Sequence, residues 1–281
     1  MLKYVIPLAF ACLHSGLQAQ PKLSIFDVHV HYAHNAFEAV PASSLIDMMR
    51  KAGLSKALVS GAMAPGSIDD GAQKLYALAP DLIVPSLRPY RNFEDLRTWF
   101  GDPEILRELE LRLQKYKYVA IGEFHLYGAS ADTEVMKSIV KLAKRYNILL
   151  HAHSDRDAVE RLFKHDPEAK ILWAHGGFDP PEAIAEMLAK HKNLWSDLAY
   201  RTDMAVDNKV SPEWLALIKR FPDRFMVGTD TFTPERLHYI GAHAEFSRRW
   251  LAGLPRDLAE RVATKNAEAL LLPIWKRVLA R

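Results

Sequence analysis

Short apolar runs rich in β-branched residues alternate along this chain with longer segments in which apolar residues recur every three or four positions. The first pattern is typical of buried strands and the second of amphipathic helices. Eight runs are predicted to be strands: residues 25–32, 56–61, 82–88, 119–126, 148–153, 171–175, 194–198 and 225–229. Helical patterns lie between them, and the clearest are 131–146, 157–165, 181–190 and 212–221.

This alternation predicts the α/β class and a single-domain closed (β/α)8 (TIM) barrel. Parallel strands joined by helices can also form an open doubly wound sheet, which usually carries a glycine-rich phosphate loop after its first strand. The chain has no such loop there, which favours the barrel. We expect the barrel domain to span residues 20–281, with 256–279 forming one or two closing helices.

The N-terminal segment differs from the rest of the chain. Lys3 is followed by an apolar stretch that ends at Leu13 and then by small and polar residues up to Ala19. This order is typical of a secretory signal peptide, and the apolar stretch is too short to span a bilayer. We predict a signal peptide at 1–19 and a periplasmic or secreted mature protein without a membrane anchor; a buried first helix or a retained anchor is the alternative.

Composition excludes several kinds of chemistry. Cys12 is the only cysteine and lies in the predicted signal peptide, so the mature chain has no thiol for a nucleophile, a disulfide or a metal. The chain carries 37 basic and 34 acidic residues, a net charge of +3, which gives no reason to expect nucleic-acid or membrane-surface binding. A small-molecule substrate is the expected partner, and the oligomeric state is not indicated.

Histidines and carboxylates gather where the predicted strands end. Residues two apart on a strand point to the same side, so a His-x-His pair can reach one ion. The C-terminal ends of all strands in a (β/α)8 barrel meet at one mouth, and imidazole and carboxylate groups are good ligands for zinc and its neighbours. The residues at these ends are His29, His31, Glu123, His125, His151, His153, His175 and Asp230.

This ordered set resembles the amidohydrolase superfamily, most closely its amidohydrolase-2 branch, with a feature of the TatD-like hydrolases on the fourth strand. The resemblance covers nearly all of the mature chain, and the segments that carry it are WAHGG at 173–177, GTDT at 228–231 and IGE at 121–123. It implies a metal-dependent hydrolase that holds one or two divalent ions, with Zn²⁺ favoured.

The resemblance also implies roles for individual residues. His29, His31 and Asp230 are expected to bind one metal, His175 and a strand-five histidine a second or shared ion, and Glu123 to bridge the two. Asp230 is predicted to be the general base, with one carboxylate oxygen on the metal and the other accepting a proton from the attacking water.

Strand five departs from the family pattern, which uses a single histidine there. Counting from the end of the preceding helix favours His153 as the ligand and places His151 deeper in the barrel. His125 has no settled counterpart and is expected to ligate or to orient substrate. For His125 and His151, a hydrogen-bonded core histidine is an equal alternative.

Substrate recognition is expected from the loops that follow the strands. Two arginines at the mouth would suit an anionic substrate such as a carboxylate or phosphate, and arginines salt-bridged inside the barrel are an equally good interpretation. Asp197 is expected to pair with one of them or to orient a histidine. The candidates for substrate binding are Arg88, His125, Tyr127 and Arg201, with Tyr90 and Tyr200 beside them.

The leading prediction is a hydrolase that uses metal-activated water on an ester, lactone, amide or phosphoester bond. Metal-dependent, non-oxidative decarboxylation of an unsaturated or aromatic acid is the alternative, because the amidohydrolase-2 branch includes such enzymes; a bridging Glu123 argues against it. A non-catalytic barrel that binds a metal or a ligand is the alternative from another class of protein. The presence of Asp230 together with the ligand set argues against it.

Overall fold

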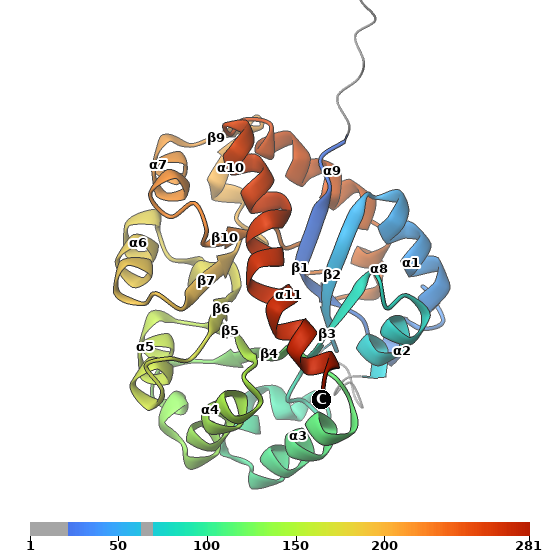
Figure 1. The fold of residues 1–281 in the computed structure, drawn as a ribbon, viewed down its shortest axis with the longest axis vertical. Helices are drawn as coiled ribbons and strands as arrows, with labels where there is room; N and C mark the ends of the chain where they lie inside the picture. Colours follow the sequence, from blue (N-terminus) through green and yellow to red (C-terminus); the bar gives the residue numbers. More distant parts are fainter. Residues whose placement is uncertain (1–21, 63–69) are drawn as a thin grey trace, which may run out of the picture.

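Eight parallel strands follow one another around a barrel in the order in which they occur along the chain, β1-β2-β3-β4-β5-β6-β7-β10. The computed structural model describes residues 22–62 and 70–281, and Figure 1 shows the helices arranged around the strands. The prediction of a single (β/α)8 barrel is confirmed. The predicted signal peptide, 1–19, lies outside the described residues.

The strands of the barrel are β1 (Ile25–His31), β2 (Leu54–Ser60), β3 (Ile83–Leu87), β4 (Ala120–Leu126), β5 (Leu149–Ser154), β6 (Ile171–Trp173), β7 (Leu194–Asp197) and β10 (Phe225–Met226). The helices are α1 (Ala42–Lys51), α2 (Asp70–Leu78), α3 (Pro103–Lys115), α4 (Glu134–Tyr146), α5 (Arg156–His165), α6 (Pro181–Lys190), α7 (Pro212–Arg220), α8 (Pro234–Leu237), α9 (Ile240–Leu251), α10 (Arg256–Glu260) and α11 (Asn266–Leu279). A small antiparallel hairpin, β8 (Ala205–Val206) and β9 (Lys209–Val210), stands outside the barrel.

Two strands end two or three residues earlier than the sequence predicts. β6 stops at Trp173 and β10 at Met226, before the residues expected to carry the chemistry. His175 and Asp230 have φ angles of 58° and 49°, a left-handed conformation that cannot continue an extended strand. Both side chains are therefore held in turns at the mouth.

Side-chain caps fix where α3, α4, α5 and α7 begin. The Ser211 hydroxyl accepts a hydrogen bond from the Trp214 N–H at 3.4 Å, directly before the first-turn proline of α7. Asp155 caps α5 by accepting from the Ala158 N–H at 2.8 Å. Such caps satisfy N–H groups that have no partner within the helix, and here they hold the loops that leave the mouth.

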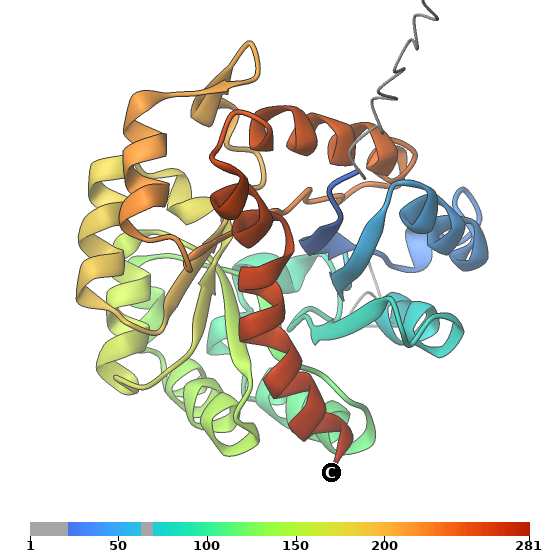
Figure 2. The ribbon, with the colours of Figure 1, turned by 45° about the horizontal axis from the view of Figure 1, so that its top comes forward.

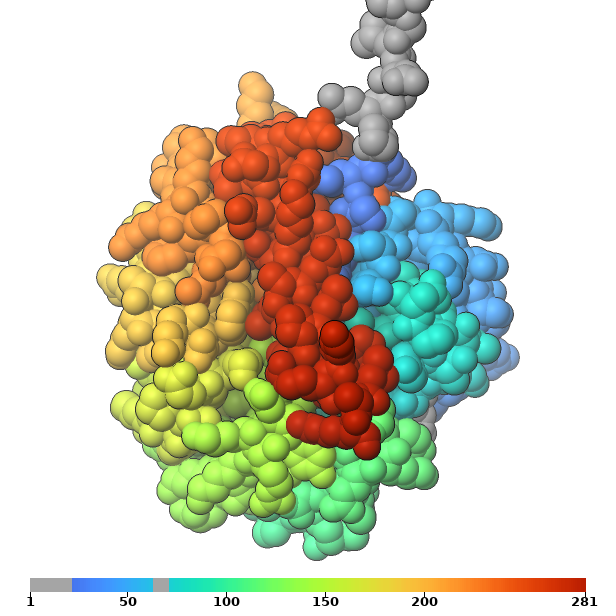
Figure 3. Space-filling view, in the orientation of Figure 1, coloured from blue at the N-terminus to red at the C-terminus, as the bar shows by residue number. Residues whose placement is uncertain are grey.

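Helix α11 lies across the N-terminal end of the barrel, and in the space-filling view the red C-terminal segment covers the middle of that face (Figures 1 and 3). The Asn266 amide donates to the carbonyl oxygens of Pro222 and Phe225, both at 2.9 Å. Trp275 packs edge-on against Tyr76 of α2, and Figure 2 shows α11 crossing this end from the side. The opposite, C-terminal end is left for the site. Within the described ranges, no helix is long and apolar enough to cross a bilayer.

A buried carboxylate helps to join the last strand to the first. In the part of the chain that the structure describes, β1 and the segment that follows β10 share isolated backbone bonds rather than a ladder, such as Val28 N–H to the Val227 carbonyl at 2.9 Å. Asp27 bridges this seam: it accepts from the N–H groups of His29 and Thr229, both at 3.1 Å, and from the Thr229 hydroxyl at 2.6 Å. Burial raises the pKa of Asp27 to about 6, and these donors oppose the rise.

Replacing this carboxylate tests its contribution to the seam. Asp27→Ala is expected to lower the free energy of unfolding by about 2–5 kcal/mol, because buried donors of His29 and Thr229 lose their acceptor. Urea denaturation followed by tryptophan fluorescence measures the change. Thr229→Val removes one donor only and serves as the control, with an expected loss of about 1 kcal/mol. An unchanged midpoint for Asp27→Ala would contradict the assignment.

Candidate metal centre

Imidazole nitrogens and carboxylate oxygens converge where β1, β4 and β10 end. His29 Nε2 lies 3.1 Å from His31 Nε2. Glu123 Oε2 is 3.4 Å and 3.2 Å from these two nitrogens, and Asp230 Oδ1 is 3.6 Å and 3.3 Å from them. All four side chains are buried. The predicted ligands from three distant parts of the chain therefore meet at one place.

His175 completes this group from the turn after β6. Its Nε2 is buried and has no hydrogen-bond partner; the nearest carboxylate oxygens, on Glu123 and Asp230, are both 3.8 Å away, beyond hydrogen-bonding distance. Its ring stacks on that of His29 with centroids 5.1 Å apart. A buried nitrogen left without a partner requires an explanation.

The opposite ring nitrogens determine which atoms face the centre. Nδ1 of each of these histidines faces an oxygen that can accept its proton. The oxygen is Asp197 Oδ2 for His29, at 3.2 Å. It is a backbone carbonyl for the other two: that of Gly61 for His31 and that of Ala199 for His175, both at 2.9 Å. Each acceptor requires a proton on Nδ1, so Nε2 of the neutral ring carries a lone pair. With all three rings neutral, three lone pairs and two carboxylates face one another, and this donor set fits a divalent ion such as Zn²⁺.

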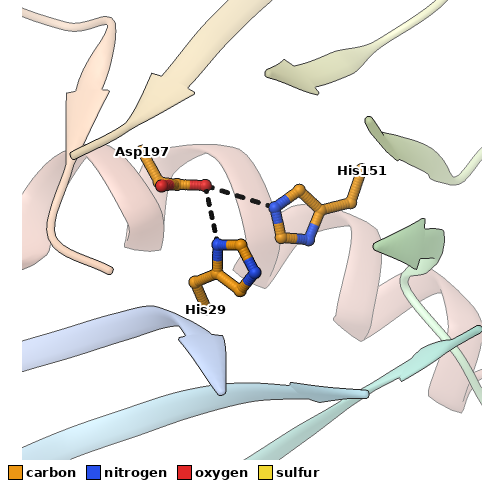
Figure 4. Close-up of side chains that lie close together, drawn as sticks. All are labelled: His29, His151 and Asp197. Atoms are coloured by element: carbon orange, nitrogen blue, oxygen red, sulfur yellow. Dashed lines mark hydrogen bonds and ion pairs between the residues drawn. The ribbon is translucent and has the colours of Figure 1, made fainter. Parts of the chain in front are cut away.

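Asp197, the last residue of β7, orients two histidines at once. Figure 4 shows its carboxylate between the rings, with Oδ2 at 3.2 Å from both His29 Nδ1 and His151 Nε2. Its other oxygen accepts from the backbone N–H groups of His175 and Ala199. Burial alone would raise the pKa of Asp197, but His29 and these hydrogen bonds hold it well below its usual value. Asp197 was expected either to pair with an arginine or to orient a histidine; in the structure it orients histidines.

The two strand-five histidines lie at different depths. His151 is buried with Nε2 committed to Asp197, and burial lowers its pKa to about 4, which keeps the ring neutral. His153 lies nearer the mouth, with a side chain 22% exposed and Nδ1 at 2.8 Å from Glu123 Oε1. This arrangement agrees with the expected relative depth; which of the two binds metal stays a prediction.

The two oxygens of Glu123 face different histidines. Oε2 lies beside His29 and His31, whereas Oε1 lies beside His153 and, more distantly, His175. Burial would raise the pKa of Glu123, but His29 and hydrogen bonds from the histidines lower it well below its ordinary value. An ionised carboxylate that points in two directions is what a bridging ligand requires.

Both predicted substrate-binding arginines are engaged with protein groups. Arg88 is fully buried and donates to Glu123 Oε2 at 2.8 Å. Arg201 donates to the His175 carbonyl at 3.0 Å and pairs with Asp203 at 2.7 Å. The two arginines are therefore salt-bridged inside the barrel, as the alternative interpretation expected. The structure does not support the predicted contact with an anionic substrate.

The other two predicted substrate-binding residues lie beside the centre. His125 Nδ1 accepts from the Tyr90 hydroxyl at 3.1 Å, and its ring stacks on His153 with centroids 4.3 Å apart. Burial lowers the pKa of His125 to about 3, so this ring is neutral. Tyr127 stands at the rim, half exposed, with its ring 6.3 Å from that of His153.

Two residues of the site were not singled out from the sequence. Phe178 stacks on His175 with centroids 4.5 Å apart and an interplanar angle of 15°. Arg236 donates to the carbonyl oxygens of Asp230 and Thr229 at 3.0 and 3.2 Å, which braces the turn that presents Asp230. Phe178 follows His175 in a strand-end loop, a position that could have suggested it. Arg236 lies in a helix and carries no comparable signal.

Comparison with known proteins agrees with this geometry. A family model described as amidohydrolase matches residues 95–272. No curated protein matches the sequence significantly.

Several solved structures share the fold at low sequence identity. An amidohydrolase from Burkholderia multivorans with bound zinc is 15% identical, with 88% of this chain and 99% of that chain covered and a TM-score of 0.57. A probable 2-pyrone-4,6-dicarboxylic acid hydrolase from Acinetobacter baumannii with citric acid bound is 12% identical. The match covers 88% of this chain and 98% of that chain, with a TM-score of 0.56. A lactonase from Listeria monocytogenes is 12% identical; the match covers 89% of this chain and 94% of that chain, with a TM-score of 0.58.

The charges at the centre predict that metal binding releases a proton. Burial disfavours the imidazolium form of His29, but the carboxylates of Asp230, Glu123 and Asp197 raise its pKa well above the ordinary value. The metal-free protein therefore holds a proton on His29 Nε2 at neutral pH. This proton stabilises the metal-free fold below about pH 6.5, and the contribution is lost as the pH rises through the raised pKa.

Zinc titration by calorimetry in buffers of different ionisation enthalpy measures this release. About one proton per ion is expected near pH 7, and zinc affinity is expected to increase with pH. A binding enthalpy that does not change with the buffer would show that His29 is already neutral.

Proposed function

The chain belongs to the amidohydrolase family, and from that premise we propose that it hydrolyses a carboxylic ester or lactone. The observation that carries the proposal is the convergence of three Nε2 atoms, on His29, His31 and His175, with the carboxylates of Asp230 and Glu123. Each of these histidines is oriented from behind by an Nδ1 acceptor. Such a preorganised donor set is typical of catalytic metal sites.

The choice of an ester bond draws on proteins of similar structure. A lactonase and a probable pyrone dicarboxylic acid hydrolase share the fold, and both names denote the opening of a cyclic ester. A lactone or ester presents a planar carbonyl whose oxygen becomes negative as water attacks. A cation at the base of the mouth suits that developing charge.

We propose Zn²⁺ as the resident ion, held by His29, His31, His175 and Asp230, with Glu123 and His153 available for a second ion. An ion at this place supplies Lewis-acid activation of a water molecule and of the carbonyl. Imidazole and carboxylate ligands suit zinc, and manganese, iron and cobalt share the same ligand set. Elemental analysis of the purified mature protein distinguishes them.

Asp230 is placed to move the proton of the attacking water. Burial would raise the pKa of its carboxyl, but His29 and the hydrogen bond from His31 lower it to about 2, so Asp230 is ionised at neutral pH. Its Oδ1 faces His29 and His31 while Oδ2 lies towards His175. One oxygen is therefore available to accept the water proton and return it to the leaving oxygen.

We also propose that the mature chain begins near residue 20 and acts in the periplasm or outside the cell. The support for this proposal is the composition of 1–19, in which a basic residue, an apolar stretch and small residues follow one another,. N-terminal sequencing of the protein recovered from the periplasm or medium tests it.

A carboxylate-to-amide substitution tests the role of Asp230. Asp230→Asn keeps one oxygen for the metal but removes the proton acceptor, so kcat/KM on esters and lactones is expected to fall about 10²- to 10⁴-fold. Metal content is measured on the same sample, and Glu134→Gln, on the exposed face of α4, is the control. Undiminished hydrolysis by Asp230→Asn would remove Asp230 as the base, and metal-dependent CO₂ release from an aromatic acid without ester hydrolysis would favour decarboxylation.

The bridging role of Glu123 predicts a change in metal stoichiometry. Glu123→Gln replaces one carboxylate oxygen with an amide nitrogen, which cannot ligate, so metal content is expected to drop by about one equivalent per chain. Elemental analysis after zinc loading measures it, and circular dichroism checks the fold. Equal metal content in the two proteins would show that Glu123 does not bridge.

A further inference from the structure

Large aromatic side chains stand exposed around the centre. Tyr127, Phe178 and Tyr200 are 51%, 53% and 37% exposed, and they come from the loops after β4, β6 and β7. We call these three residues the aromatic collar. Exposed apolar surface gathered at one place, rather than scattered singly, marks a binding surface.

The collar surrounds two histidines of the centre. Tyr127 lies 6.3 Å from the ring of His153, and Phe178 lies 5.9 Å from it. Phe178 also stacks on His175 at 4.5 Å, and Tyr200 approaches His175 from another direction at 6.1 Å. Aromatic faces therefore lie directly beside the histidines of the centre.

The backbone at two collar positions is strained. Phe178 and Tyr200 have φ angles of 57° and 56°, a conformation that bulky residues rarely adopt. Strain of this kind concentrates at functional sites, where the surrounding structure enforces it. Neither the exposure of these rings nor their backbone conformation stabilises the fold, so the arrangement indicates binding.

The described arginines near the collar are not free to pair with an anionic substrate. Three neighbouring arginines form salt bridges with protein carboxylates: Arg88 with Glu123, Arg201 with Asp203, and Arg156 with Asp179 at 3.2 Å. A fourth, Arg236, donates to two carbonyl oxygens and lies against the ring of Tyr200. Segment 63–69, outside the described residues, contains no lysine or arginine.

We propose that the aromatic collar binds an uncharged aromatic group, so that the substrate is a neutral aryl ester or aromatic lactone. This rests on the proposed hydrolase function and names its substrate class. Aromatic faces recognise a flat ring by stacking and edge contacts, whereas a carboxylate would meet the electron-rich faces of the collar without a free guanidinium to pair with. The collar is thus a specificity element, separate from the metal ligands.

Kinetics on matched lactones test the collar. Dihydrocoumarin contains a fused benzene ring and δ-valerolactone contains the same lactone ring alone. The ratio of their kcat/KM values is expected to fall about 3- to 10-fold in Phe178→Leu and in Tyr200→Leu, which keep apolar bulk but remove the ring. Using the ratio within each variant cancels the different reactivities of the lactones. Tyr146→Leu, which removes a ring from the C-terminal end of α4 at the opposite end of the barrel, is the control and is expected to leave the ratio unchanged.

A binding measurement keeps the test independent of turnover. Calorimetry with 2-tetralone, a ketone analogue of dihydrocoumarin, is compared with cyclohexanone and with anionic 2-naphthoate. We expect 2-tetralone to bind most tightly, and its advantage over cyclohexanone to fall about 3- to 10-fold in Phe178→Leu and Tyr200→Leu.

The outcomes separate the two proposals. Collar-dependent binding of 2-tetralone without hydrolysis of any lactone would support the collar and overturn the hydrolase proposal. Hydrolysis with ratios that Phe178→Leu and Tyr200→Leu leave unchanged would overturn the collar alone, and so would preferential binding of 2-naphthoate.

Discussion

The hydrogen bonds made by Nδ1 of His29, His31 and His175 are the interactions on which the centre depends. An imidazole can ligate only through a nitrogen that carries no proton, and these bonds decide which nitrogen that is. The acceptors are a buried carboxylate at the end of β7 and two backbone carbonyls in strand-end loops. Only a barrel that brings these ends to one mouth can supply them together, so the fold fixes the chemistry through its peptide groups as much as through its side chains.

The negative charge of the centre follows from the same architecture. Glu123, Asp197 and Asp230 are carboxylates held away from water within one cluster of histidines. Burying unpaired carboxylates is costly, and here each is surrounded by imidazole or guanidinium groups. Arg88 therefore balances the charge of Glu123 from inside the barrel, and the mouth is left to aromatic side chains.

Much of this could be predicted from the sequence, because strand and helix periodicity and the parity of His-x-His pairs are local properties. The barrel, the helices after residue 131 and the meeting of His29, His31, Glu123 and Asp230 all follow from them. The partners of Arg88 and Arg201 could not be predicted, because a guanidinium binds carboxylates of the protein and of a substrate by the same chemistry. The left-handed turns at His175 and Phe178 were equally hidden, since nothing in those residue types requires a positive φ.

The seam between the first strand of the barrel, β1, and the last, β10, lies next to the metal centre. Asp27 and Thr229, which join this seam, are two positions before His29 and one before Asp230. Completing the barrel and assembling the donor set therefore depend on the same contacts, which join residues 202 positions apart in sequence and form against a large loss of chain entropy. Residues that hold an ion across this seam act as a clasp between the first strand and the last. The protein would thus take up its metal only once its topology is complete, and metal occupancy would report on the finished fold.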